Sequence, residues 1–522
     1  MKLSPWRTTW VLVVVLMISG LAGIVFGAQS QAGKEKDMDN AIKNFSSVLG
    51  LIEENYVDPV ESDKAVYGAI AGMLRTLDPH STFFDPKAFV SSREDQRGKY
   101  YGLGITVTSR FGNVTVISPP FAGSPAERAG LRVGDVISHV NGESAMGMDL
   151  NDVISRLKGP RGTSVKITIR RPGADEPIEM SVIRDEIAKF TISSAFYVRP
   201  GIGYIKLDSF AETSGSELRD ALRKLDPAKL EGLIFDLRSN RGGVLPAAIE
   251  IGEAFLQKGQ AILETKGRVR GSNRTYSSGK TNTENLFPLV VLINGDSASA
   301  SEIVAGAIQD HDRGLIIGQT SFGKGLVQSV FELNKNAGLA LTTQKWYTPS
   351  GRLIQRDYSQ ISQFDYYNHK EAPAKKDDIK RSDTGRIVYG GGGITPDYVV
   401  EDPKSNDVQE MLARRYVFYT FVQELMKKDP AIEKSFKVTD EVLADFKQHL
   451  AKRGVQLRDR DFQDNVEFVK RSIRYEVLYD KFGVAEAIRS LLDTDVQVLK
   501  ALELMPSAKD LAGKARQIAD RR

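Results

Sequence analysis

Apolar residues recur at helical spacing near the start of the chain, between Met38 and Leu77. They stand three and four residues apart, which is the period of one face of a helix. The dipeptide Asp58-Pro59 interrupts the pattern, so two helices are predicted, one on each side of it. The turn-forming sequence DPHSTFFDP follows within this N-terminal helical region, residues 39–97.

Residues 98–185 change to short runs in which apolar and polar positions alternate. These runs are GITVTS, NVTVIS, DVISHVNG, SVKITIRR and IEMSVIR. Alternation with a period of two is typical of half-buried strands, and MDLNDVISRLKG is the one helical piece among them. A small β domain is therefore predicted.

From residue 186 to 402 strand-like and helix-like segments alternate, which predicts a layered α/β domain with its chemistry on loops at strand ends. Residues 403–522 read as charged helices with one apolar stripe each. We expect a C-terminal helical region there that offers contacts for a homodimer or a higher oligomer.

The first 28 residues form a membrane anchor or a signal segment. A basic cluster precedes the run from Trp10 to Ala28, 19 residues without a charge. This length suits an uncleaved anchor, although Val25 and Gly27 also permit cleavage. Because the positive end stays inside, the rest of the chain is expected on the periplasmic side of the inner membrane.

The composition excludes several classes of chemistry. The 522 residues contain no cysteine, which rules out disulfides, thiolate metal sites and a cysteine nucleophile. The net charge of +4 comes from interspersed charges, so no nucleic-acid partner is expected. We also expect no metal and no cofactor.

The sequence DSASASEIVAGAIQD, residues 296–310, places three serines between a buried strand and an apolar-periodic helix. A nucleophile at such a turn benefits from the unpaired amides of the first helical turn. The same serines also suit helix capping, because Ser299 and Glu302 match the S-x-x-E capping box. Every helix needs a cap, so this stretch alone favours capping.

A nucleophilic serine requires a base. The five histidines all lie away from the serine turn in sequence context, which disfavours a Ser-His hydrolase. Lys324, in QTSFGKGLVQ, is the alternative if an apolar setting lowers its pKa. The spacing G-x-x-x-x-G-K also suggests a phosphate loop, but Gly325 replaces the Ser/Thr that would hold magnesium.

The sequences YGLGITV, residues 101–107, and SPAERAGLRVGDVISHVNGE, residues 124–143, closely resemble a PDZ domain. The resemblance implies a site for protein or peptide substrates with apolar C-termini. In it, backbone amides at Gly102 and Gly104 face the terminal carboxylate, while Leu103 and Ile105 line a pocket for the last side chain.

The serine and lysine stretches, together with FDLRSNRGGVLPAAIEI and GGGGITPD, resemble the C-terminal processing (tail-specific) serine peptidases across roughly residues 39–402. The resemblance implies that Ser299 is the nucleophile, Lys324 the general base and Gln328 the group that positions the lysine. It further implies oxyanion donors among the backbone N–H groups of Ala300, Gly242 and Gly243.

We therefore expect an α/β multidomain protein, with a PDZ-like β domain before a layered α/β serine-protease core, N-terminal helices and a C-terminal helical extension. The expected function is a serine endopeptidase that recognises protein tails and cleaves them with a Ser-Lys dyad. The alternative is a catalytically inactive PDZ scaffold or a chaperone-like tail-binding protein.

Overall fold

The computed structural model describes residues 37–279, 286–368 and 378–519. It divides into two compact units, and the division falls after Asp85. The expected anchor, residues 1–28, lies outside the described residues. Within the ranges given above, no helix is both long enough and apolar enough to cross a membrane.

The first unit contains the two helices that the sequence predicts. One covers residues 37–55 and the other, α2, covers Ser62–Arg75, so the break falls at Asp58-Pro59. A short strand, β1, follows at Thr82–Phe84.

The second unit begins with helix α3, Pro86–Arg97, and with strand β2, Lys99–Gly102. Strand β9, Asp185–Ala188, pairs antiparallel with β2. The chain enters and leaves the β domain through this two-stranded ribbon, which makes the domain an insertion before the α/β core.

The inserted domain is a β sheet with two helices. Its sheet has the order β3-β4-β5-β7-β8, with β6 paired to β5. The bounds are β3 Val107–Arg110, β4 Asn113–Val116, α4 Pro125–Arg128, β5 Val136–Val140, β6 Glu143–Ser144, α5 Leu150–Leu157, β7 Ser164–Arg170 and β8 Ile178–Ile183. Alternate strand residues such as Val165, Ile167 and Ile169 are fully buried in its core, as the period of two predicts.

The α/β core is built on a sheet of order β10-β11-β12-β15-β16-β21, parallel from β11 to β21, with β10 antiparallel at one edge. Its strands are β10 Ile192–Arg199, β11 Ile202–Leu207, β12 Gly232–Asp236, β15 Leu289–Ile293, β16 Leu315–Gly318 and β21 Tyr398–Val399. One face packs against helices α6 Ser214–Lys224, α7 Leu245–Phe255 and α8 Ala300–Asp310.

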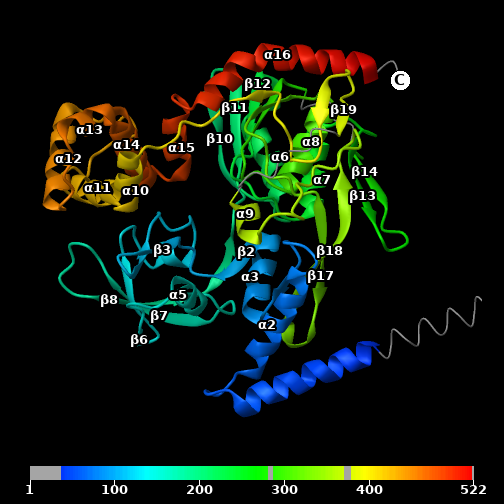
Figure 1. The fold of residues 1–522 in the computed structure, drawn as a ribbon. Coiled ribbons are helices and arrows are strands. Elements are labelled where there is room, and N and C mark those ends of the chain that lie inside the picture. The colour runs from blue at the N-terminus through cyan, green and yellow to red at the C-terminus, as the bar shows by residue number, and fades with distance from the viewer. Residues whose placement is uncertain (1–36, 280–285, 369–377, 520–522) are drawn as a thin grey trace, which may run out of the picture. The chain divides into compact units, whose positions relative to one another are not determined.

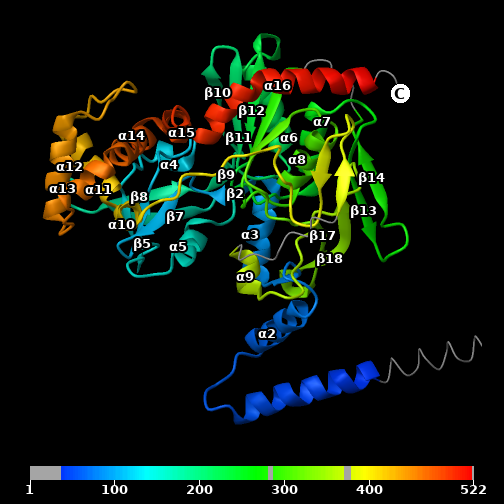
Figure 2. The ribbon, with the colours of Figure 1, turned by 45° about the horizontal axis from the view of Figure 1, so that its top comes forward.

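The opposite face of this sheet is covered by the end of the chain. Helix α16, Val496–Ala519, lies across it and buries Val498, Ala501 and Leu504 against the strands (Figures 1 and 2). Helix α15, Val484–Leu492, packs beside β10. This part of the C-terminal region is therefore a layer of the core, whereas the sequence pattern predicted a helical region that offers contacts for an oligomer.

A second sheet joins β17 Leu326–Glu332, β18 Gly338–Tyr347, β13 Ala261–Gly267 and β14 Arg274–Ser277. The β17–β18 hairpin starts two residues after Lys324. Short elements complete the core: η1 Pro227–Lys229, η2 Asn334–Asn336, α9 Gln363–Tyr367, β19 Ile379–Arg381 and β20 Ile387–Tyr389.

The remaining helices form a small bundle with its own apolar core, which includes Phe421, Phe446 and Ile473. Its helices are α10 Asp407–Arg414, α11 Val417–Lys428, α12 Asp440–Lys452, α13 Asp459–Asp464 and α14 Val466–Phe482.

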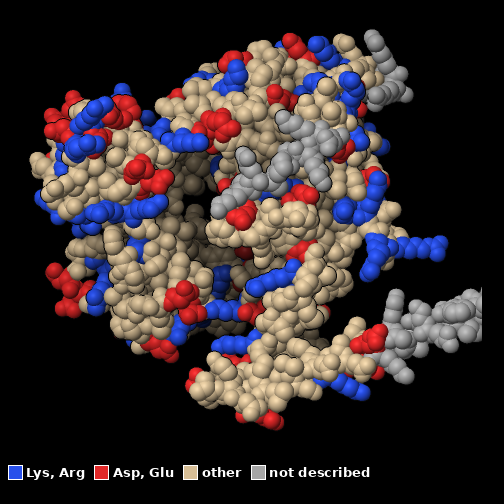
Figure 3. Space-filling model, in the orientation of Figure 1, with Lys and Arg blue, Asp and Glu red and all other residues tan. Residues whose placement is uncertain are grey.

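On the face seen in Figure 3, basic and acidic side chains are interspersed over the surface.

Candidate active site

The candidate site lies where two neighbouring parallel strands end. Strands β12 and β15 pair side by side, with Asp236 opposite Leu292. The loops that leave their carboxyl ends carry the Gly242-Gly243 pair and the serine turn. This is the edge at which α/β sheets place their functional groups.

The three serines of the turn have different environments. Ser297 is fully buried, and its Oγ donates to the Leu237 carbonyl at 2.8 Å. Ser301 is also fully buried, and its Oγ donates to the Asn240 carbonyl at 2.8 Å. Ser299 between them is half-buried. The two outer serines therefore fasten the turn to the loop that follows β12.

Ser299 has an unusual backbone conformation, with φ 55° and ψ −112°. A non-glycine residue at positive φ is strained, and such strain persists only where the surroundings enforce it. Sharp strand-to-helix turns expose a nucleophilic serine in α/β hydrolases. The turn thus presents the Ser299 side chain at the start of α8.

Glu302 connects this turn with the lysine loop, which is residues 319–325 between β16 and β17. Its side chain is fully buried, and it accepts the Ser299 N–H at 2.7 Å, as a capping box requires. It also accepts from three further donors: Ser321 Oγ at 2.5 Å, Gly323 N–H at 2.7 Å and Lys324 N–H at 2.9 Å. Burial raises the pKa of Glu302, and these hydrogen bonds lower it in part.

Lys324 is half-buried on a loop that is fixed from several sides. The neighbouring Phe322 donates its N–H to the Ser297 carbonyl at 3.0 Å. Trp346 of β18 donates its indole N–H to the Lys324 carbonyl at 3.0 Å. Phe322 itself packs with Tyr366 and Ala298. The backbone of this loop is therefore fixed next to the serine turn.

The glycine pair lies directly against the serine turn. Gly242 has φ +91°, and a Cβ there would lie 2.9 Å from both Ser299 Cβ and the Ala300 nitrogen. Its N–H donates to Asn240 Oδ1 at 2.9 Å. That N–H is therefore engaged within the loop, and the expectation that Gly242 supplies an oxyanion donor stays a prediction.

Two other amides at the turn remain available. In the described part of the chain, neither the Gly243 nor the Ala300 N–H donates to a protein acceptor. A Cβ at Gly243 would lie 1.9 Å from the Phe210 carbonyl oxygen, so only glycine fits. These two N–H groups suit the oxyanion role expected for them.

Gln328 lies on β17, at an irregularity between Val327 and Gln328 in the pairing with β18. Its amide Nε2 donates to Thr342 Oγ1 at 3.1 Å. The side chain is thereby oriented from the hairpin that follows Lys324. The sequence marked Gln328 as a candidate, but gave no sign of its hydrogen bond to Thr342.

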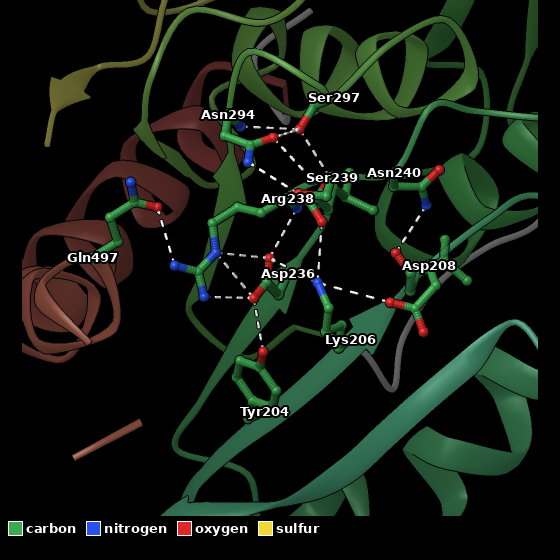
Figure 4. A network of polar contacts seen from close by, with 12 residues as sticks. Tyr204, Lys206, Asp208, Asp236, Arg238, Ser239, Asn240, Asn294, Ser297 and Gln497 are labelled. Atoms are coloured by element: carbon green, nitrogen blue, oxygen red, sulfur yellow. Dashed lines mark hydrogen bonds and ion pairs between the residues drawn. The ribbon is translucent and has the colours of Figure 1, made fainter. Parts of the chain in front are cut away.

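A buried polar network supports the β12 loop from below (Figure 4). Asp236, at the end of β12, accepts from Arg238 Nη2 and from the Tyr204 hydroxyl, each at 2.7 Å. Arg238 also reaches Asp495 at 2.8 Å and Gln497 at 3.2 Å, near the start of α16. The Arg238 guanidinium helps to hold the pKa of Asp236 well below its usual range against the opposing effect of burial.

The sequence analysis missed these supporting residues. Only the strand-end motif FDLRSN marked the region, and the contacts of Arg238 with the far C-terminus leave no local signal. Asn240 was missed too: its Nδ2 donates to the Leu207 carbonyl at 2.8 Å while its Oδ1 fixes Gly242.

The histidines with described side-chain contacts are engaged elsewhere. His311 bonds Asp383 and the Ala261 carbonyl, His449 bonds Thr420, and His139 lies beside Ser138 in the inserted domain. None of these four contacts involves the serine turn. The Ser-His alternative therefore has no support in the described side-chain contacts.

The loop expected to bind a peptide tail lies in the inserted domain. Gly104 has φ +81°, and its carbonyl accepts the Phe121 N–H at 2.9 Å. Leu103 and Ile105 line a pocket of about 260 Å³ together with Ile154 and Leu157. Leu103 is also part of the domain core, with 2% of its surface exposed. Three of the four predicted loop residues, Leu103, Gly104 and Ile105, thus line this pocket, and Gly102 does not.

Three family models match the chain. Peptidase family S41 matches residues 201–362, the PDZ domain matches residues 116–171, and the activating protease CtpB N-terminal domain matches residues 24–88. The first two cover the α/β core and the inserted domain described above.

Curated relatives extend the similarity to most of the chain. A carboxy-terminal-processing protease of Bartonella bacilliformis is 36% identical over 398 residues, which are 75% of this chain and 83% of that protein. Carboxy-terminal processing protease CtpB of Bacillus subtilis is 35% identical over 354 residues, which are 66% of this chain and 72% of that protein.

Among solved structures, a photosystem II D1 C-terminal processing protease matches with 26% identity and a TM-score of 0.35, covering 68% of this chain and 92% of that one.

Proposed function

Since the chain belongs to the carboxy-terminal processing proteases of peptidase family S41, we propose that it cleaves proteins with a Ser299–Lys324 dyad. Neutral Lys324 accepts the Ser299 proton as Ser299 attacks the scissile carbonyl. The peptide C–N bond then breaks, Lys324 returns the proton to the leaving amine, and water hydrolyses the acyl-enzyme ester to free Ser299. The N–H groups of Gly243 and Ala300 stabilise the oxyanion. Gln328 positions the lysine through its side-chain carbonyl oxygen.

The observation that carries the proposal is the Glu302 carboxylate. Its Oε2 accepts the backbone N–H of both Ser299 and Lys324, at 2.7 and 2.9 Å. The two amide nitrogens are therefore no further apart than the sum of these distances. A dyad requires such proximity, whereas a helix cap alone does not require a lysine loop at the same carboxylate.

Recognition of the substrate belongs to the PDZ domain in this proposal. The loop from Gly102 to Ile105 takes the terminal carboxylate of an apolar tail, and the tail adds as a strand to the sheet edge. Cleavage occurs upstream of the bound tail, because the groove and the serine turn lie in different domains. The substrate class is thus unfolded protein segments near an apolar C-terminus.

The test uses the purified chain and an unfolded protein with an apolar C-terminus. Wild type should cleave it, while Ser299→Ala and Lys324→Ala should each lose activity and still melt cooperatively. Lys345→Ala, at an exposed lysine of β18, is the matched control and should cleave normally. An inactive wild type that still binds the tail would instead favour the scaffold alternative.

We further propose that the protein works on the periplasmic side of the inner membrane, held there by residues 1–28. The charge-free run behind a basic cluster supports this placement. Fractionation of cells, followed by N-terminal sequencing of the mature protein, tests both the location and the retention of the segment. A protein found in the cytoplasmic fraction would contradict the proposal.

We propose a homodimer or higher oligomer as the working form. On the helix of residues 37–55, apolar side chains on one stripe are 46–63% exposed: Met38, Ile42, Phe45 and Val48. An apolar stripe of this size normally has a partner. Light scattering should show more than one chain per particle, and Ile42→Glu with Phe45→Glu should yield monomers.

A further inference from the structure

The pocket beside the tail-binding loop has one charged wall. Its apolar lining includes Leu103, Ile105, Phe121, Ile154 and Leu157. Helix α3, which precedes the PDZ domain in the chain, contributes Glu94 and Asp95 to the same pocket. A site proposed to take a carboxylate is therefore lined by the chain's own carboxylates.

Each of these carboxylates holds a lysine of the groove. Glu94 Oε2 lies 2.5 Å from Lys158 Nζ, and the two side chains are only 22% and 30% exposed. Asp95 lies 2.8 Å from Lys189, but both of these side chains are more than half exposed. Exposed ion pairs contribute little because water screens them. The pair of Glu94 and Lys158 is therefore the one that matters energetically.

The position of Glu94 places its charge near the carboxylate-binding loop. Tyr100 lies under Lys158, with the ammonium 4.7 Å from the ring centroid. The pKa of Tyr100 is raised to about 12, mainly by burial and next by the charge of Glu94, while the Gly104 N–H lowers it. Glu94, Tyr100 and Gly104 thus share one electrostatic environment.

We propose that Glu94 is a built-in competitor of the substrate tail: it neutralises Lys158 in the empty groove, and an arriving tail carboxylate displaces it. The inference rests on the proposed role of the groove in binding tails. When a tail is bound, the partly buried Lys158 faces two carboxylates, that of Glu94 and that of the tail. These two negative charges repel each other. Binding therefore releases Glu94 and the end of α3 that carries it.

The other end of α3 contacts the catalytic hairpin. Phe89 is 5% exposed and packs on Gly338, where a Cβ would lie 2.2 Å from the ring. Gly338 starts β18 and pairs with Glu332 at the end of β17. There is no spare room at this contact, so a displacement of α3 moves the tip of the hairpin.

The base of the same hairpin holds the lysine loop. Trp346 donates its indole N–H to the Lys324 carbonyl at 3.0 Å and its backbone N–H to the Gly325 carbonyl at 2.9 Å. Helix α3 therefore connects the groove, through Glu94, with the Lys324 loop, through Phe89 and the hairpin. Contiguous packing of this kind is a route for coupling, and coupling has to be measured.

The first experiment measures binding in the Ser299→Ala background, with a fluorescent peptide that ends in apolar residues and its C-terminally amidated form. Glu94→Gln should bind the free-acid peptide about fivefold more tightly, the scale of a modest ion pair. The affinity for the amidated peptide should not change. Glu179→Gln removes an exposed ion pair with Lys166 on the same domain and should change neither.

If Glu94→Gln and the Ser299→Ala reference bound the free-acid peptide equally well, the proposal that Glu94 competes with the tail would be wrong. Absence of binding by the parent would instead refute the proposed groove function, so the two failures are distinct. The second experiment adds free tail peptide to active enzyme that cleaves an amidated substrate. The peptide should increase the cleavage rate of the wild type. Phe89→Leu should bind the peptide with unchanged affinity but show no increase in rate. An increase in rate in Phe89→Leu would overturn the connection between α3 and the Lys324 loop.

Discussion

The backbone amides of Ser299 and Lys324 donate to the same oxygen atom of the buried Glu302 carboxylate, at 2.7 and 2.9 Å. The residues are far apart in the sequence and are brought together by one side chain. The capping interaction that the local sequence predicts and the nucleophile that the family implies are therefore compatible. The same glutamate that accepts the N–H of the N-cap residue Ser299 also fixes the loop of the proposed base.

Replacing Glu302 by glutamine should inactivate the enzyme without changing side-chain volume. The amide can accept at one oxygen only, so at least one of the four donors loses its partner. An unsatisfied buried donor costs about 1–3 kcal/mol. We expect a lower melting temperature and a fall in kcat that exceeds the change in KM. Normal turnover by a folded Glu302→Gln enzyme would show that the carboxylate has no part in positioning the site.

Among the three serines, alanine substitution should separate catalysis from support. Ser299→Ala should abolish cleavage with little change in stability, because its side chain is half-buried. Ser301→Ala removes one buried hydrogen bond and should lower the free energy of unfolding by about 1 kcal/mol, whereas Ser297→Ala removes two and should cost about 2 kcal/mol; both should keep turnover. Denaturant melts and initial rates of the three variants check this. Loss of all activity in folded Ser301→Ala would contradict the assignment.

Gly242→Ala should impair catalysis through geometry. The new Cβ would meet Ser299 Cβ and the Ala300 nitrogen at 2.9 Å, which displaces the nucleophile and an oxyanion donor together. We expect about a 100-fold loss in kcat, the scale of losing one oxyanion donor. Gly112→Ala is the matched control, since it also has positive φ, +73°, but no atom within 4 Å. The control should remain active.

The sequence could predict what depends on local pattern. The two N-terminal helices, the alternating strands of the inserted domain and the strand-to-helix turn at Ser299 all follow from hydrophobic period and turn residues. The fold class and the family are confirmed by the structural layers and by the relatives.

The rest depends on contacts between distant segments. Glu302 was identifiable as a cap, but its bonds to Gly323 and Lys324 arise only when two loops meet. Gly242 was expected to donate to the oxyanion, yet Asn240, two residues earlier, uses that N–H. The packing of α16 on the core sheet was hidden because an apolar stripe does not name its partner.

Removal of residues 484–522 should therefore unfold the α/β core. Each large apolar side chain of α16 buried on the sheet contributes roughly 1.5–3 kcal/mol, and the truncation also leaves Arg238 without Asp495. Together these losses approach the whole stability of a typical domain, about 5–15 kcal/mol. The truncated chain should be insoluble or lack a cooperative melt. A soluble, active truncation would show that α15 and α16 are dispensable.

The stability of the core should depend on pH through His311. Its Nδ1 lies 2.8 Å from Asp383 and its Nε2 lies 2.8 Å from the Ala261 carbonyl. Both partners are acceptors, and only the imidazolium form has two N–H donors. Burial lowers the pKa of His311, but the bonds to Asp383 and Ala261 outweigh it, so the pKa is raised above the usual 6.5.

A raised histidine pKa stabilises the folded state fully below the unfolded value of about 6.5, and this contribution is lost as the pH rises through the folded value. His311→Gln should therefore cost about 2 kcal/mol at pH 5.5 and less at pH 9, from hydrogen bonds to a charged group. Asp383→Asn keeps the histidine but removes its charged partner, and should show a reduced pH dependence of the same sign. Urea melts at both pH values measure the free energy of unfolding. If His311→Gln lowered it equally at pH 5.5 and at pH 9, His311 would not be charged in the folded protein.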